Sequence, residues 1–177
     1  RSRLTRVDFS AASMGQANLF GAELYDSVFH ETDLARSDLR FSRWIGVDLT
    51  EADLQHVALH ETKWRRVLAL GADFSGASGF IATDGLIKCK TTLPDNSVTS
   101  CDLRTKNLRE SDLAGRTLVG GDLRGAKLKR RGLKGANLIG ANLSGLDLVD
   151  LGLDAEGTYL SAANLSRTVL KGLNFDF

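Results

Sequence analysis

Two His-Glu-Thr tripeptides, at residues 30–32 and 60–62, carry the residue types most suited to chemistry, and His56 is the third histidine of the chain. An imidazole next to a carboxylate can bind a metal ion or take part in acid–base catalysis when further groups converge on it. Whether any group converges on these pairs depends on the elements that position them, so the answer lies in the periodicity of the whole chain.

Composition indicates a chain built from many equivalent aliphatic positions. The 177 residues include 18 glycines and one proline, and the formal net charge is +1. A chain so close to neutral has no strong overall attraction to nucleic acid or membrane. No apolar run reaches membrane-spanning length, and no charged-then-apolar leader is present. We expect no membrane span and favour the cytoplasm, although the first residue, Arg1, leaves room for a missing targeting segment.

The sequence repeats with a period of five, which neither an α-helix nor an ordinary β-strand has. A large apolar residue, most often Leu, recurs at every fifth position. Trp44 and Trp64 belong to this series, so both indoles are expected in the core. The series forms three blocks, from Leu4 to Phe74, from Leu93 to Leu153 and from Leu160 to Phe175.

Small residues and glycines occupy fixed places around each large apolar residue. Two positions before it the residue is usually small, as at Ala17, Ser37 and Ala136. Two positions after it Gly is frequent, as at Gly21 and Gly120, and a type II turn requires Gly where φ is positive. Large and small side chains that both point inward, separated by tight turns, predict a solenoid of short strands.

Segments such as 17–19 (Ala-Asn-Leu), 52–54 (Ala-Asp-Leu) and 136–138 (Ala-Asn-Leu) resemble the A(D/N)Lxx signature of the pentapeptide-repeat family, and the resemblance covers nearly the whole chain. It implies an all-β fold, a right-handed quadrilateral parallel β-helix with about 20 residues in each coil and coils about 4.8 Å apart. It also implies a function, because several members of this family mimic DNA, engage DNA gyrase and confer resistance to quinolones.

The period falters after Phe74, where several apolar residues leave the register. Residues 75–92 are therefore expected to form an irregular loop or a distorted coil. We expect one repeat domain over residues 1–177, with sub-stacks at 1–74 and 93–177.

A two-residue slip after Leu153 predicts a small bulge at residues 154–158. The sequence also stops inside the repeat, and an open solenoid end exposes unpaired strand edges and apolar side chains. The last coil is therefore expected to meet a partner, a second copy of the chain or further missing chain through Leu173, Phe175 and Phe177.

The two cysteines, Cys89 and Cys101, are too few for a disulfide framework and lack the spacing of metal ligands. A disulfide between them would pin the irregular segment in an oxidising compartment. Cys101, however, occupies a small inward position, where buried free thiols are common. We expect both cysteines to be reduced.

Residues twenty apart should stack in columns along the coils, and these columns decide what the histidines can do. His30 and His60 are one and a half coils apart, so they fall on opposite faces and cannot share a metal ion. His56 has Arg36 and Gly76 as column neighbours, which complete neither a ligand set nor a catalytic triad. No phosphate loop or cofactor motif is present. The sequence predicts no catalytic, cofactor-binding or metal-binding residues, and no enzyme.

Some charged residues occupy repeat positions with a structural meaning. Asp33, Asp53 and Asp73 form one column that could bind a cation, but the D/N position of the repeat usually accepts hydrogen bonds from nearby turn backbone. We favour that structural interpretation. Arg116 and Arg131 occupy the small inward position, where an unpaired guanidinium is prohibitive, so their stems reach outward or the coil is locally deformed.

Positive charge gathers between residues 103 and 135. Arg104 should stack on Arg124, and nearby carboxylates offset only part of the charge. Such a patch could bind an acidic protein surface or a phosphate, whereas nucleic acid is disfavoured because no aromatic residues are interleaved. A solvated face without function is an equal alternative. The candidate binding patch is Arg104, Arg109, Arg124, Lys127, Lys129, Arg130 and Lys134.

These features favour a non-enzymatic scaffold that presents flat solenoid faces to a protein partner. The DNA-mimicking, gyrase-interacting function implied by the resemblance is one alternative, but the net charge near zero and the basic patch depart from the acidic members of the family. A passive repeat domain of a larger effector or lumenal protein is the other alternative.

Overall fold

The computed structural model describes residues 2–80, 85–109, 113–149, 151–153 and 158–171. These residues form short β-strands and isolated bridges joined by turns, without a helix, and so without any helix able to cross a membrane. The chain divides into two compact units, Arg1–Ser100 and Cys101–Phe177. Each unit is a stack of coils paired in parallel, which confirms the predicted all-β parallel β-helix. The predicted sub-stack boundaries remain a prediction.

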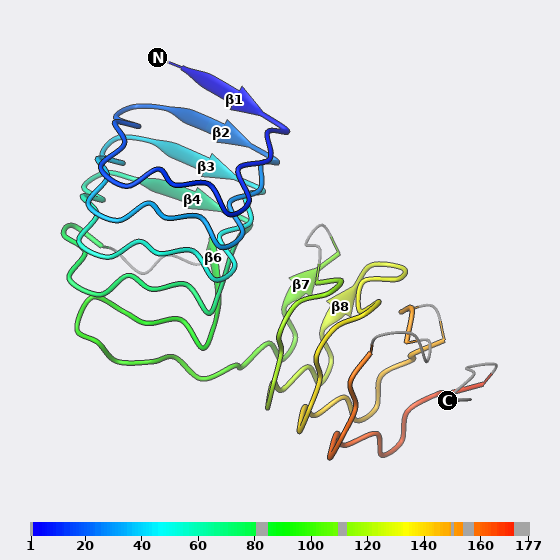
Figure 1. Ribbon diagram of the computed structural model, residues 1–177. Helices are drawn as coiled ribbons and strands as arrows, with labels where there is room; N and C mark the ends of the chain where they lie inside the picture. Colours follow the sequence, from blue (N-terminus) through cyan, green and yellow to red (C-terminus); the bar gives the residue numbers. More distant parts are fainter. Residues whose placement is uncertain (1, 81–84, 110–112, 150, 154–157, 172–177) are drawn as a thin grey trace. The chain divides into compact units, whose positions relative to one another are not determined.

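In the first unit, four strands form a parallel sheet in the order β1-β2-β3-β4 (Figure 1). Residues 20 apart are direct partners, such as Leu24 and Trp44. A second strand pair aligns Val67 with Leu86, so the distorted coil within residues 75–92 is one residue short. The strands are β1 (Arg3–Thr5), β2 (Glu23–Tyr25), β3 (Arg43–Ile45), β4 (Lys63–Arg65), β5 (Val67–Leu70) and β6 (Leu86–Cys89).

The second unit repeats this architecture with shorter strands. β7 (Asn107–Leu108) pairs in parallel with β8 (Lys127–Leu128), again at a separation of 20 residues. Further along, Asn137 pairs with Tyr159, so this coil is two residues longer. Residues 154–157, where most of the bulge was expected, lie outside the described residues, as do Leu173, Phe175 and Phe177.

The core of the first unit is a column of aromatic and leucine side chains. Phe29 and Trp44 are fully buried, with ring centroids 5.1 Å apart, and Trp44 lies 5.7 Å from Trp64. The predicted inward stack of indoles is confirmed. Polar residues at the small inward position are satisfied by backbone, since Thr32 Oγ1 donates to the carbonyl of Phe9 at 2.7 Å. The interior therefore holds large and small side chains in alternation, without orphaned hydroxyls at these places.

The described coils turn through residues in the left-handed region of φ. Gly21 and Gly120 have φ of 64° and 67°, as the sequence predicts. The same turn position is also filled by residues with a Cβ, such as Ala11 at 56° and Glu31 at 54°. The stacked coils must hold these residues in a conformation that costs about 1 kcal/mol each.

The D/N position of the repeat serves the turns. Asp33 Oδ1 accepts the backbone N–H of Ala35 at 2.9 Å, and Asp53 and Asp73 bond in the same way to residues two positions on. These bonds satisfy turn N–H groups that the coil leaves without a partner. The structure thus agrees with the structural interpretation of this acidic column.

Of two expectations about inward positions, the one for the cysteines is wrong and the one for Arg131, a local deformation of the coil, is confirmed. Both cysteines, Cys89 and Cys101, are disulfide-bonded in the structure, so the expectation of reduced thiols is wrong. Arg131 does not point inward, because the turn after Leu128 is shifted by one residue. Arg131 takes the turn conformation at φ 55° and is exposed, while Gly132 fills the buried position. The position of a residue in its column does not predict whether a cysteine forms a disulfide. It does not predict a one-residue shift of a turn either.

Candidate functional site

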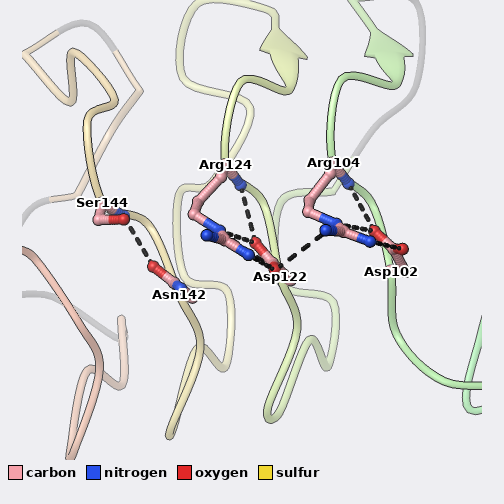
Figure 2. Close-up of polar contacts among 6 residues, drawn as sticks. All are labelled: Asp102, Arg104, Asp122, Arg124, Asn142 and Ser144. Atoms are coloured by element: carbon pink, nitrogen blue, oxygen red, sulfur yellow. Dashed lines mark hydrogen bonds and ion pairs between the residues drawn. The ribbon is translucent and has the colours of Figure 1, made fainter.

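The charged face of the second unit is built on two copies of Asp-Leu-Arg, at residues 102–104 and 122–124. Leu103 and Leu123 are buried, and they anchor the flanking charged residues to the core. Asp102 and Asp122 form a parallel bridge, so the two copies lie one coil apart (Figure 2). We call Asp102, Arg104, Asp122 and Arg124 the Asp-Arg ladder.

Each arginine of the ladder is held by its own aspartate. Arg104 donates from its backbone N and from Nε to Asp102 Oδ1, at 3.1 and 2.9 Å, and from Nη2 to Asp102 Oδ2 at 2.7 Å. Arg124 makes the same bonds to Asp122, with an Nη2–Oδ2 distance of 2.6 Å. Two parallel bonds from a planar guanidinium fix its orientation as well as its position.

The ladder is also connected between coils. Arg104 Nε lies 3.7 Å from Asp122 Oδ2, so positive and negative groups alternate along the column (Figure 2). On the next coil the equivalent residues are Asn142 and Ser144, where Asn142 Oδ1 accepts the backbone N–H of Ser144 at 3.1 Å. The hydrogen bond from the turn backbone to the side chain is kept on this coil, but the charged pair is not.

The ladder stays ionised over the physiological range. The hydrogen bond from the Arg104 side chain, followed by the one from its backbone, lowers the pKa of Asp102 to about 2. The side chain of Arg124 likewise lowers the pKa of Asp122, and the aspartates raise the pKa of both arginines. Arg104 and Arg124 are about half exposed, and ion pairs this open add little to folding stability.

The seven residues of the predicted basic patch are all described, and they differ in their surroundings. Arg104 and Arg124 stack as predicted, but each is paired with an aspartate, so neither is a bare positive charge. Arg109, Lys127 and Lys134 are exposed and form no ion pair with any residue that the structure describes. Arg130 is exposed and Lys129 is half-buried. The binding role of these residues remains a prediction.

The surface around the ladder has a shallow depression and exposed apolar side chains, neither of which was predicted from the sequence. A shallow depression is lined by Asp102, Arg104, Thr105 and Lys106. Val119 and Ile139, both 37% exposed, lie on adjacent coils, since Gly120 N donates to Ile139 O at 2.8 Å. The signal was in the sequence, because an apolar residue directly after the inward leucine must point toward solvent.

The first unit contains a third Asp-Leu-Arg copy, at residues 38–40. Arg40 Nη2 lies 2.6 Å from Asp38 Oδ2, and the Arg40 guanidinium also lies 5.6 Å from the ring centroid of the exposed Phe20. This copy has the same local bonds as the ladder but no second Asp-Arg pair on a neighbouring coil. It therefore provides a matched control for the ladder.

A family model for pentapeptide repeats, with 8 copies, matches residues 2–40, 32–67 and 107–145. No curated protein was found to match. Among solved structures, a pentapeptide repeat protein from the thylakoid lumen of Arabidopsis thaliana is 22% identical, with 56% of this chain and 70% of that chain covered and a TM-score of 0.50.

Two further solved structures are similar with lower TM-scores. A trypsin-treated form of QnrB1, a plasmid-mediated fluoroquinolone resistance protein, is 18% identical, with 97% of this chain and 86% of that chain covered and a TM-score of 0.47. HetL, a protein involved in heterocyst differentiation regulation in the cyanobacterium Nostoc sp. strain PCC 7120, is 23% identical, with 97% and 88% covered and a TM-score of 0.25. Function has to be argued from the surface of this chain, because a shared fold does not fix it.

Proposed function

Because the chain belongs to the pentapeptide repeat family, we propose that it is a non-enzymatic scaffold whose second unit binds an acidic protein surface through the Asp-Arg ladder and the neighbouring basic residues. The observation that carries the proposal is the bidentate pairing within the ladder. Each guanidinium is already fixed before any partner arrives, on a backbone that the coil stacking holds in place.

Pre-organisation matters because ordering a long side chain costs binding free energy. The guanidinium has five N–H donors, and the Nε and Nη2 groups of Arg104 engage Asp102. The remaining donors stay available to a carboxylate of a partner, in a geometry suited to bidentate recognition. Arg124 repeats the arrangement one coil away, so two carboxylates on an extended acidic segment could be recognised together.

The residues around the ladder favour a protein over a nucleic acid. Arg109 and Lys127 supply positive potential on one side of the ladder, while Val119 and Ile139 supply exposed apolar area on the other. Arginine is enriched at protein interfaces, and the buried core of an interface is more apolar than the rest of the surface. Single-stranded nucleic acid needs aromatic platforms for its bases, and none of the described patch residues is aromatic.

The test is an affinity capture from lysate of the source cells at moderate salt, with mass spectrometry as the readout. The bait is the full chain, compared with a variant in which Arg104, Arg109, Arg124 and Lys129 are all replaced by Glu. An Arg40→Glu variant, in the matched Asp-Leu-Arg copy of the first unit, is the control. A protein captured by wild type and control but not by the reversal variant supports the proposal. Capture that the reversal leaves unchanged contradicts it, and recovery of gyrase or topoisomerase subunits in that case favours the DNA-mimic alternative.

A further inference from the structure

In the first unit, His30, Glu31 and Glu51 bring metal-ligating atoms together at the corner of two stacked coils. One ligand atom from each residue lies within 4.8 Å of the others. Glu31 and Glu51 hold the same turn position, with φ of 54° and 58°, and Glu31 N donates to the carbonyl of Thr50 at 3.0 Å. The two carboxylates are therefore carried by adjacent, hydrogen-bonded turns rather than by mobile loops.

The imidazole of His30 is oriented by a group outside this cluster. Its Nδ1 lies 3.0 Å from the carbonyl oxygen of Thr50. A carbonyl oxygen can only accept, so the proton of the ring is on Nδ1, and the lone pair of the neutral ring is on Nε2. A backbone carbonyl that holds the Nδ1–H is the arrangement that supports histidine ligands in metal sites.

Nε2 of His30 faces a carboxylate, and either a proton or a metal ion between the two atoms would stabilise this contact. His30 Nε2 lies 3.4 Å from Glu31 Oε1. Two acceptors at this distance repel each other unless a proton or a metal ion lies between them. No Lys or Arg in the described part of the chain pairs with Glu31 or Glu51, so the imidazole of His30 faces these carboxylates without help from another basic side chain.

The column that contains the glutamates has no bulky side chain next to them. It continues with Ala11 on one side and Gly71 on the other, so small residues flank the two carboxylates. His30 is 27% exposed and Glu31 57% exposed, and an ion here would keep water at its remaining positions. One imidazole nitrogen with two carboxylate oxygens is a donor set that suits Zn²⁺ and similar divalent transition ions better than Mg²⁺, which prefers oxygen alone.

We propose that His30, Glu31 and Glu51 form a binding site for a divalent transition-metal ion, with Zn²⁺ as the preferred ion, which links two adjacent coils of the first unit. The site is independent of the proposed docking face, which lies on the second unit. Metal bound only by the folded chain raises its stability. The ion would act as a cross-coil link at a corner where Cβ-bearing residues occupy the left-handed region.

The chain offers an internal control, because His60-Glu61-Thr62 repeats the tripeptide of the site. The residue 20 positions before Glu61 is Phe41, and Phe41 N donates to the carbonyl of His60 at 2.9 Å. Phe41 corresponds to Ala11 beside the site, so no carboxylate stacks on Glu61 from the preceding coil. His60→Ala therefore removes an imidazole of the same local sequence without touching the proposed site.

The experiment is a titration of the chelator-treated full chain with Zn²⁺ by calorimetry, together with Co²⁺ absorption and thermal unfolding. We expect about one equivalent of Zn²⁺ and a rise in Tm, both retained in His60→Ala and lost in His30→Ala. Glu51→Gln, which keeps the shape of an exposed side chain, should weaken binding about tenfold or more. Equal Zn²⁺ affinity in wild type and His30→Ala, loss of binding in His60→Ala alone, or no binding at millimolar Zn²⁺ would overturn the proposal.

Discussion

The Nε atom of Arg104 lies 3.7 Å from Oδ2 of Asp122, a residue on the neighbouring coil of the second unit (Figure 2). The same guanidinium is bound in bidentate fashion to Asp102 on its own turn. One side chain thus joins two coils at the surface, where it gives little stability but a fixed direction to its remaining donors.

Replacing Arg104 with Gln should raise the pKa of Asp102 from about 2 toward its ordinary value of 3.8. The folded-state pKa lies below the unfolded one, so the stabilisation from this pair is complete above about pH 4 and is lost as pH falls toward 2. An NMR titration of the Asp102 carboxyl carbon measures the change, with Arg40→Gln as control. An Asp102 pKa that stays near 2 in Arg104→Gln would show that another group depresses it.

Leu143→Asp should unfold the second unit. Leu143 is fully buried, and a charge there has no partner, so we expect a loss of more than about 4 kcal/mol. Circular dichroism with chemical denaturation measures it, and Ser144→Asp, one position along and pointing outward, is the control. Leu128→Asp should cost less, because Leu128 is only half-buried. Intact cooperative unfolding of Leu143→Asp would contradict the register of the coils.

Ala11→Gly should stabilise the first unit by up to about 1 kcal/mol, because Ala11 has φ of 56° and glycine adopts this region without strain. Ala12→Gly should have the opposite effect, of about 0.5–1 kcal/mol, since Ala12 is in the small inward position and not at positive φ. The denaturant midpoints of unfolding of the two variants and of the wild type measure these changes. The same sign for both changes would be inconsistent with the turn geometry.

Asp53→Ala should destabilise the chain by about 1 kcal/mol, because the backbone N–H of Gln55 loses its acceptor at 2.9 Å. Asp53→Asn keeps an acceptor oxygen and should change the unfolding free energy by less than about 0.5 kcal/mol. Equilibrium unfolding of the pair separates a turn-bonding role from an electrostatic one. If Asn were as damaging as Ala, the negative charge itself would be what matters.

The period of five predicted most of the inward residues, and the 20-residue coil implied by the family resemblance predicted which residues are neighbours on adjacent coils. Leu24 and Trp44 pair as the 20-residue coil requires. The coil from Val67 to Leu86 is one residue short, and this was missed because residues between the blocks carry no regular apolar signal.

Contacts between particular side chains were harder to predict from the sequence than the stacking of residues twenty apart. The bidentate contact between Arg104 and Asp102 depends on side-chain rotamers across a turn, which periodicity does not determine. Glu31 and Glu51 are twenty residues apart, so their stacking could have been predicted. The column positions of His30 and His60 were compared instead, and the second glutamate that completes the cluster was missed.

The most direct test of the docking face is the affinity of a captured partner for the purified chain, measured by calorimetry against three baits. These are the wild type, the variant with Arg104, Arg109, Arg124 and Lys129 replaced by Glu, and Arg40→Glu. The proposed function predicts that the reversal variant loses binding by at least about tenfold while its circular dichroism is unchanged, and that Arg40→Glu binds like wild type. Equal affinity of the correctly folded reversal variant would contradict it and leave the charged face without a role in binding.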